Sequence, residues 1–410
     1  MVPIVDYPPV VQRYLPHFRP HFANEPQFKH FAEYLTGLIV CWKFSVAFMN
    51  SQFVGHRDPS TKTRFLTEVD WPEDRVEETR IGLILKRVQG ISPRKCRLAI
   101  DDVLIHHDRS KVMEGVSKHY DHCTGTYVTG HVLVNAHLIT PVGHFPVAFD
   151  LYVPAQEDGE SHQTKITMAQ ALIRRAKALG VPFETVVFDS WYLCEELAQF
   201  LDAEKLSWVS ALKSNRIVLV NNRRVDITTF LNTEAGGTWR TTEVDGKSFT
   251  YLTAVIKLST LGRVRIVALK DTEEQTGFKV LVTGEKSWGA EGIIRAYRAR
   301  WSIETFHQDA KQNLGLESSM VRDLTGIKRH WLLVHLAYTI LELASSLNGG
   351  LGKWVQDHAA SIGAMCRQAT QDTVRCLILW VIRVAQSGIS TEILLSTLYG
   401  HPKLQVAESG

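Results

Sequence analysis

The change in hydrophobic period near residue 96 constrains the fold of this 410-residue chain more than any other feature. β-branched and aromatic residues dominate three runs that are separated by turn-forming residues, at 97–107, 127–140 and 144–154. Runs of this kind predict three successive antiparallel strands. The next four segments alternate between an amphipathic helix and a short apolar strand, at 163–180, 184–192, 193–205 and 206–214. This region therefore predicts a mixed sheet with helices packed against it.

Three strands followed by alternating helices and strands are the order of an α/β sheet of the ribonuclease-H type. We assign the first part of this core to residues 96–215 and its second part to 287–348. Between them, residues 216–286 contain many short strand-like runs and are interpreted as a β-rich insertion. Residues 349–410 are predicted to form a helical C-terminal region. Glycines mark the helix breaks expected after Ser287, at the Gly349–Gly350 pair, around Gly363 and at Gly400.

Residues 1–95 carry apolar side chains at three- and four-residue spacings, which predicts a small helical domain. We interpret it as a DNA-binding domain with basic loops. The loop cations are His56, Arg57, Lys62 and Arg64. The net charge of +3 permits a nucleic-acid partner without requiring one, because local patches make the phosphate contacts.

The composition is that of a folded intracellular protein. The chain is 45% hydrophobic, and its six cysteines form no C-x-x-C pair, which argues against a zinc ribbon, a redox motif or a disulfide scaffold. The N-terminus lacks the basic and apolar regions of a signal peptide. The apolar stretch 331–347 is interpreted as a buried core helix rather than a membrane span. We therefore expect a cytoplasmic protein with no membrane partner.

Two positions in the predicted sheet carry aspartates that are costly to bury unless they are paired or bind a metal. Asp101 and Asp102 lie inside the apolar run 97–107 and point to opposite faces of the strand. Asp189 lies at the C-terminal end of a predicted parallel strand, where ligand sites of open α/β sheets are found. Structural alternatives stay open, because one aspartate of the pair could bind Arg97 and Asp189 could cap the next helix.

A third acidic residue lies on a predicted helix from Tyr297 to Lys311. At roughly 100° per residue, one face with an arc of about 80° holds Tyr297, Arg300, Glu304, Gln308 and Lys311. Glu304 is suited to a metal ion, and Arg300 and Lys311 are suited to phosphates. A solvated face with an Arg300–Glu304 ion pair explains the same spacing. Lys213 and Arg298 are further candidates for contacts with DNA.

The spacing Tyr297-x2-Arg300-x3-Glu304-x6-Lys311 matches the YREK signature of bacterial transposases of the insertion-sequence-4 superfamily. The segments IDDVLIHHDRSKVMEGVSKHYDH and FDSWY are most similar to the 701 group of that superfamily. The resemblance spans approximately residues 20–350. One position departs from it: Val103 follows the acidic pair, where related enzymes often have Thr or Ser.

The resemblance implies a ribonuclease-H-like catalytic core with Asp102, Asp189 and Glu304 as its metal-binding triad. Asp102 is preferred over Asp101 because the family places its first ligand second in such an acidic pair. The implied cofactor is a pair of Mg²⁺ ions, for which Mn²⁺ can substitute. The long gap between Asp189 and Glu304 agrees with the β-rich insertion that this family carries before its catalytic glutamate.

The resemblance further implies a cut-and-paste DNA transposase. Such an enzyme binds the terminal inverted repeats of its element, cleaves the ends and joins their 3′ ends to target DNA, working as a homodimer on paired ends. One alternative is a ribonuclease-H-like nuclease without strand transfer. Another is a repurposed DNA-binding protein, against which the three acidic residues argue, since binding alone has no need for them.

Overall fold

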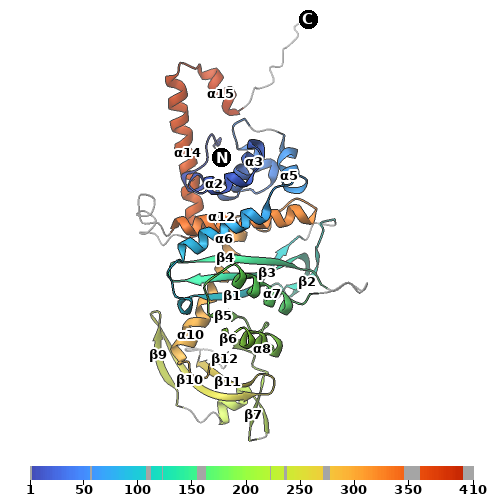
Figure 1. Cartoon of the computed structure of the whole chain (residues 1–410), viewed down its shortest axis with the longest axis vertical. Helices are drawn as coiled ribbons and strands as arrows, with labels where there is room; N and C mark the ends of the chain where they lie inside the picture. Colours follow the sequence, from blue (N-terminus) through green and yellow to red (C-terminus); the bar gives the residue numbers. More distant parts are fainter. Residues whose placement is uncertain are drawn as a thin grey trace. The chain divides into compact units, whose positions relative to one another are not determined.

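The computed structural model describes residues 2–55, 58–107, 112–121, 123–154, 163–221, 223–234, 238–270, 278–345 and 361–399. The chain is mixed α/β, with a large mixed sheet and with helices towards both ends of the sequence (Figure 1). It divides into two compact units. The first comprises Met1–Arg87, His106–Val116 and Gln308–Gly410, and the second comprises Val88–Ile105 and Ser117–His307.

The first unit is helical, as predicted for residues 1–95. Its helices and 3₁₀ turn before residue 88 are α1 (Pro9–Gln12), α2 (Leu15–Phe18), η1 (Arg19–His21), α3 (Glu25–Val40), α4 (Val46–Ser51), α5 (Pro59–Thr67) and α6 (Glu73–Arg87). Side-chain caps set several helix starts; Asn24, for example, accepts from Gln27 N at 3.0 Å at the start of α3.

Helix α12 (Leu324–Ser345) forms the centre of the first unit. It packs against α3, α5 and α6, and it is buried on nearly all sides, as expected of a helix that is apolar all round. The interpretation of the apolar stretch as a core helix is confirmed for residues 331–345. No helix in the described part of the chain is long and apolar enough to cross a membrane.

The basic residue Lys62 is not in a loop, contrary to the sequence prediction. It lies on α5 with only 1% of its surface exposed, and its ammonium group is 2.6 Å from Glu33 Oε2 and 2.5 Å from Asn50 Oδ1. Arg64 lies on the same helix, whereas His56 and Arg57 fall outside the described residues. Burial of Lys62 is possible because Glu33 neutralises its charge.

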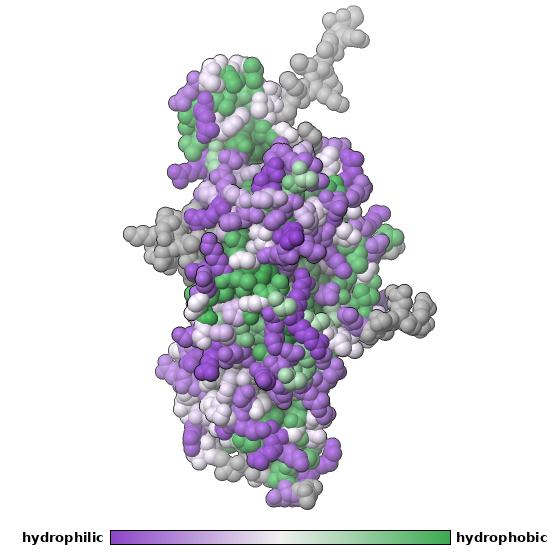
Figure 2. Space-filling view, in the orientation of Figure 1, coloured by the Kyte–Doolittle hydropathy of each residue, from purple (hydrophilic) through white to green (hydrophobic). Residues whose placement is uncertain are grey.

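The C-terminal segment adds α14 (Ile362–Gln386) and α15 (Thr391–Tyr399) to the first unit. A helix boundary lies around Gly363, as predicted, because α14 begins at Ile362 and Ser361 caps it. The breaks predicted at Gly349–Gly350 and Gly400 lie outside the described residues. Apolar residues gather on the surface of α14 and α15 (Figure 2).

The second unit is built on one twelve-stranded mixed sheet (Figure 1). Its path runs β2-β3-β1-β5-β6-β12-β11-β10-β7-β8, with β4 paired to β3 and β9 paired to β10. The first six strands are β1 (Arg97–His106), β2 (Ser117–Asp121), β3 (Thr126–Thr140), β4 (Gly143–Tyr152), β5 (Thr185–Phe188) and β6 (Ser207–Leu212). Strands β3 and β4 are antiparallel, and β5 is parallel to both β1 and β6.

The predicted strands and helices between residues 97 and 214 are confirmed, with α7 (Lys165–Ala178) and α8 (Glu195–Ala203) as the two helices. Strand β2 was not predicted, because its sequence SKHYD is short and mostly polar. The short 3₁₀ turn η2 (Pro93–Lys95) leads into β1. Gly130 on β3 allows the close approach to β1, since a Cβ at this position would lie 2.2 Å from the carbonyl oxygen of Ile105.

The segment 216–286 is rich in strands, and these strands continue the same sheet. They are β7 (Ile217–Val220), β8 (Arg223–Asp226), β9 (Arg240–Val244), β10 (Lys247–Leu258), β11 (Gly262–Lys270) and β12 (Phe278–Thr283), with α9 (Ile227–Thr229) and the π-helical turn η3 (Phe230–Glu234) after β8. β12 pairs with β6 from Val280↔Leu212 to Thr283↔Val209. Helices α10 (Ala290–Ala299) and α11 (Trp301–Asn313) follow.

Candidate active site

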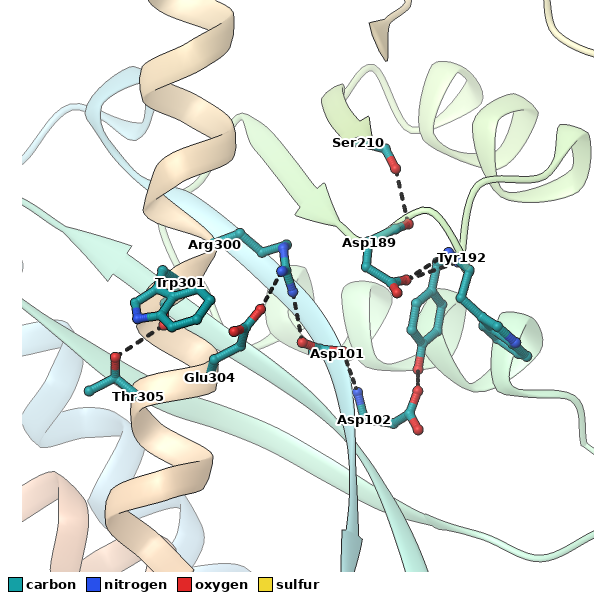
Figure 3. A network of polar contacts seen from close by, with 10 residues as sticks. Asp101, Asp102, Asp189, Tyr192, Ser210, Arg300, Trp301, Glu304 and Thr305 are labelled. Atoms are coloured by element: carbon teal, nitrogen blue, oxygen red, sulfur yellow. Dashed lines mark hydrogen bonds and ion pairs between the residues drawn. The ribbon is translucent and has the colours of Figure 1, made fainter. Parts of the chain in front are cut away.

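The two aspartates of β1 lie at the centre of a polar network (Figure 3). Asp102 N donates to Asp101 Oδ1 at 3.0 Å, and the two carboxylates then take separate partners. Asp101 binds Arg300, whereas Asp102 binds Tyr192 and Lys165. Because successive side chains of a strand point to opposite faces, Asp101 points towards the junction of α10 and α11, and Asp102 points towards α7. Asp101 pairs with Arg300 and not with Arg97.

Arg300 links the strand to the third acidic residue. Its Nη1 donates to Asp101 Oδ2 at 2.9 Å, and its Nη2 donates to Glu304 Oε1. The Arg300 side chain is only 12% exposed, so the charge-assisted bonds to the two carboxylates are shielded from water. The Arg300–Glu304 ion pair that spacing allowed is therefore present, and it reaches the acidic pair of β1 rather than facing solvent.

The prediction of one continuous helix from Tyr297 to Lys311 is wrong at Arg300. Helix α10 ends at Ala299 and α11 begins at Trp301. Across the junction, Arg300 N donates to Tyr297 O at 3.1 Å, and Ile303 N donates to Arg300 O at 3.0 Å. These bonds span three residues instead of four, which is the tighter 3₁₀ geometry common at helix ends. Arg300 and Glu304 still meet, because Arg300 lies at the junction and Glu304 lies in the first turn of α11.

Asp189 directly follows β5, at the C-terminal end of a parallel strand, as the sequence predicted. Its Oδ1 accepts from Trp191 N at 2.9 Å and from Tyr192 N at 3.3 Å, and Ser210 on β6 donates to its carbonyl oxygen at 3.0 Å. Asp189 is not the N-cap of the next helix, since Cys194 caps α8. The turn fixes Asp189 and aims Tyr192, whose hydroxyl donates to Asp102 Oδ1 at 2.9 Å.

Figure 3 shows that these contacts connect four acidic residues in one series, from Glu304 through Arg300 to Asp101 and Asp102, and through Tyr192 to Asp189. Burial raises the pKa of Asp101 to about 7; Arg300 opposes this rise, whereas the negative charges of Asp102 and Asp189 add to it. Burial, followed by the charge of Asp102, also raises the pKa of Tyr192, so this hydroxyl remains a donor. The site therefore concentrates negative charge.

Lys165 is a site residue that the sequence analysis missed. It is the first residue of α7, and its ammonium group lies 2.7 Å from Asp102 Oδ2. The same group lies 5.2 Å from the ring centre of Tyr152 and 5.1 Å from that of Trp191, which gives it two cation–π contacts. The sequence signal was weak, because a lysine in the first turn of a helix is ordinary.

Two cavities of the second unit receive most of the predicted site residues. One, of about 480 Å³, is lined by all three aspartates together with Lys165 and Lys213. The other, of about 610 Å³, is lined by cations and aromatic side chains. Its lining includes Lys247, Lys279, Arg295, Tyr297, Arg298, Arg300 and Trp301, with Asp245 as the acidic member. Arg300 lines the basic cavity and binds Asp101, which lines the acidic cavity.

The remaining predicted DNA contacts have partners within the protein. Arg298 donates to Val244 O at 2.6 Å and lies over the Phe249 ring. Lys311 belongs to the first unit, where it pairs with Glu317 at 2.7 Å.

Carboxylate oxygens are the donors that Mg²⁺ prefers, and Asp101, Asp102 and Asp189 line the same cavity. Among the described residues, however, no three acidic, histidine or cysteine side chains are close enough together to share one ion. The cations Arg300 and Lys165 lie directly against the carboxylates. The donor types therefore suit divalent ions, while Arg300 and Lys165 neutralise the aspartates in the metal-free arrangement.

Comparison with known families identifies the chain. The family of DDE superfamily endonucleases matches residues 17–274. The chain belongs to this family. DDE endonucleases usually use divalent metal ions, in agreement with the acidic cavity. Asp102 and Asp189 lie within the matched residues, whereas Glu304 lies beyond them.

One individual relative of this DDE endonuclease is a distant one. A probable transposase for insertion sequence element IS701 from Microchaete diplosiphon is 26% identical over 218 residues, which are 52% of this chain and 56% of that protein. The chain therefore matches little more than half the length of this relative.

Solved structures give weaker likenesses. A piggyBac transposase synaptic complex with hairpin DNA covers 87% of this chain and 73% of its own, at 13% identity and a TM-score of 0.43. Endonuclease V from Bacillus subtilis covers 68% of this chain and 96% of its own, at 10% identity and a TM-score of 0.22. Neither likeness is high enough to establish a shared fold.

Proposed function

We propose that this DDE endonuclease is a DNA transposase that binds terminal inverted repeats, cleaves the element ends and joins their 3′ ends to target DNA. The observation that carries the proposal is the polar network that joins Glu304 to Asp102 and Asp189, residues that come from distant parts of the sequence. Such convergence of acidic residues is what phosphodiester cleavage and strand transfer both need, because each is an in-line displacement at phosphorus.

The strand order supports a ribonuclease-H-like catalytic core. Strands β4, β3, β1, β5 and β6 follow one another across the sheet. β3 and β4 are antiparallel, and β5 is parallel to both of its neighbours. The proposed ligands occupy a central strand, the turn after the next strand and the helix after the insertion, and a series of polar contacts connects them.

We assign Asp102, Asp189 and Glu304 as the residues that hold two Mg²⁺ ions. When bound, such ions stabilise the charge on the attacking and leaving oxygens of the phosphodiester. Asp101 competes with Asp102 for this assignment, since it is Asp101 that reaches Glu304 through Arg300. Replacing each aspartate by asparagine and titrating Mg²⁺ calorimetrically distinguishes them, because the residue that ligates metal is the one whose loss weakens binding most.

In this proposal, basic side chains of the protein donate hydrogen bonds to the phosphates of DNA. Arg300 and Lys165 neutralise the carboxylates in the metal-free arrangement, and they become available to DNA oxygens once metal ions replace them. Tyr297 and Arg298 line the basic cavity, and Lys213 lines the acidic one. Lys311 and the helical N-terminal domain provide further DNA contacts, and two copies of the chain act on paired ends.

The test is an end-cleavage assay with DNA that carries the flanking element ends and Mg²⁺. We expect Glu304→Gln to bind these ends as the wild type does and to lose cleavage and joining. Glu195→Gln is the matched control, because Glu195 is exposed on α8. Equal cleavage by wild type and Glu304→Gln removes Glu304 from the chemistry. Pre-cleaved ends that are hydrolysed but never joined identify a nuclease instead of a transposase.

A further inference from the structure

Lys165 is held in the acidic cavity by three groups that come from different parts of the sequence. Its ammonium group lies 2.7 Å from Asp102 Oδ2. The same group lies 5.2 Å from the ring centre of Tyr152 and 5.1 Å from that of Trp191. The Lys165 side chain is only 18% exposed, although most lysines extend into water. The surrounding groups therefore set the position of this ammonium group.

The two rings belong to well-anchored parts of the sheet. Tyr152 is the last residue of β4, and Trp191 lies in the turn after β5. Trp191 N donates to Asp189 Oδ1 at 2.9 Å, and its ring packs against that of Tyr192 with 5.0 Å between the ring centres. Cation–π contacts attract an ammonium group whatever the charge of Asp102. The rings therefore keep this group beside Asp102 when another cation binds that carboxylate.

The acidic cavity needs a cation if it is to receive a phosphodiester. Three aspartates line it, and their negative charge repels a phosphate. Its lining also includes Lys165 and Lys213. An ammonium group has three N–H donors, and one of those of Lys165 is directed to Asp102 Oδ2. Lys165 thus combines a positive charge and several donors with a place next to a proposed metal ligand.

We propose that Lys165 binds the phosphate that is cleaved, and that Tyr152 and Trp191 position it there. This inference rests on the proposed function and deepens it. The ammonium group donates a hydrogen bond to a non-bridging oxygen of the scissile phosphate and keeps its own protons. Negative charge is spread over these oxygens in the transition state, so the bond stabilises the displacement. Lys165 is then a catalytic residue outside both the acidic triad and the YREK signature.

The first test is single-turnover cleavage of end DNA with Mg²⁺ and saturating protein. Lys165→Met should lower the rate about 100-fold, the loss typical of removing one donor to a developing negative charge. Lys165→Arg keeps the positive charge and should retain more of the rate. Lys177→Met is the matched control and should cleave as the wild type does, because Lys177 lies on the same helix and pairs with Glu204 outside the cavity.

The same assay tests the two positioning residues. Trp191→Ala and Tyr152→Ala should each lower the rate roughly fivefold, because each removes one cation–π contact. Trp191→Phe and Tyr152→Phe keep an aromatic ring and should restore most of the rate. Alanine variants that cleave as fast as the wild type remove the rings from this role.

The second test measures binding and needs no cleavage. End DNA carries either a phosphate or an uncharged methylphosphonate at the element boundary, and its affinity with Mg²⁺ is measured by fluorescence anisotropy for proteins that carry Glu304→Gln. Adding Lys165→Met should reduce the preference for the phosphate about tenfold, because a charge-assisted hydrogen bond is lost. A lysine with a merely structural role would change both affinities equally.

The proposal is overturned if Lys165→Met cleaves at the wild-type rate, or if it keeps the full preference for the phosphate. Failure of the proposed function is a separate result. A preference that depends on Lys165, in a protein whose wild type never cleaves or joins element ends, upholds the phosphate contact and refutes transposition.

Discussion

Two buried histidines of α12 should make the stability of the first unit strongly dependent on pH. His330 Nε2 donates to Gly315 O and its Nδ1 accepts from the Tyr34 hydroxyl, each at 2.9 Å, so the neutral ring has both nitrogens satisfied. Burial lowers the pKa of His330 from 6.5 to about 4. Burial, reinforced by the charge of Arg80, lowers the pKa of His335 to about 3.

The direction of the effect follows from proton binding. Below pH 6.5 the unfolded chain protonates both histidines, whereas the folded chain keeps them neutral down to pH 4 or 3. Stability is therefore complete above pH 6.5 and is lost as the pH falls. Each pH unit between the two pKa values costs about 1.4 kcal/mol per histidine, so at pH 5 each contributes a loss of about 2 kcal/mol. Together they remove about 4 kcal/mol, a large part of the 5–15 kcal/mol typical of a protein.

Urea unfolding at pH 8 and pH 5 tests this for the wild type, His330→Gln and His335→Gln. Comparing each protein with itself at two pH values cancels the cost of the substitution. We expect each variant to lose about 2 kcal/mol less than the wild type on acidification. His17→Gln, at an exposed position, should lose as much as the wild type. The reasoning fails if the two α12 variants lose as much stability as the wild type does.

Three further predictions concern the second unit. Gly130→Ala should lower the free energy of unfolding by about 3 kcal/mol or more, because the new Cβ meets a main-chain carbonyl oxygen of β1 at 2.2 Å; an unchanged melting temperature contradicts this. Tyr192→Phe removes the donor to Asp102 and should weaken Mg²⁺ binding roughly tenfold or more in a calorimetric titration; unchanged affinity would exclude the hydroxyl from a role in orienting the carboxylate. Arg300→Met leaves its two carboxylates without their cation and should destabilise the protein by about 3 kcal/mol. Mg²⁺ should raise the melting temperature of this variant more than that of the wild type, and an equal rise refutes the idea that Arg300 and metal ions compete.

The regular elements of the core could be predicted because their signals are local. Runs of β-branched and aromatic residues identify β1, β3 and β4, short apolar runs identify β5 and β6, and amphipathic periodicity identifies α7 and α8. The 3₁₀ turn at Arg300 could not be predicted, since RARWS contains no glycine or proline to mark it. The burial of Lys62 was also missed, because its partner Glu33 lies on another helix and sequence alone does not pair the two.

The sequence predicted the acidic residues of the candidate site, but it did not predict the residues that bind them. Asp101 and Asp102 are conspicuous because charge interrupts an apolar strand. Lys165 and Tyr192 become visible only when folding brings them to Asp102, across 63 and 90 residues of sequence. The sequence favoured Asp102 over Asp101 by resemblance alone, and the structure adds that Asp101 is the one joined to Glu304 through Arg300.

The pairing of β12 with β6 has a mechanical consequence. Four register pairs, from Val280↔Leu212 to Thr283↔Val209, fasten the strands of segment 216–286 to the strand beside β5, after which Asp189 stands. The segment cannot rotate or slide against the core without breaking this ladder, and a slip by one residue would turn every side chain of β12 to the opposite face. A displacement of Lys247 on β10 or Lys279 on β12 would therefore be transmitted to the strands that carry the acidic residues through this ladder.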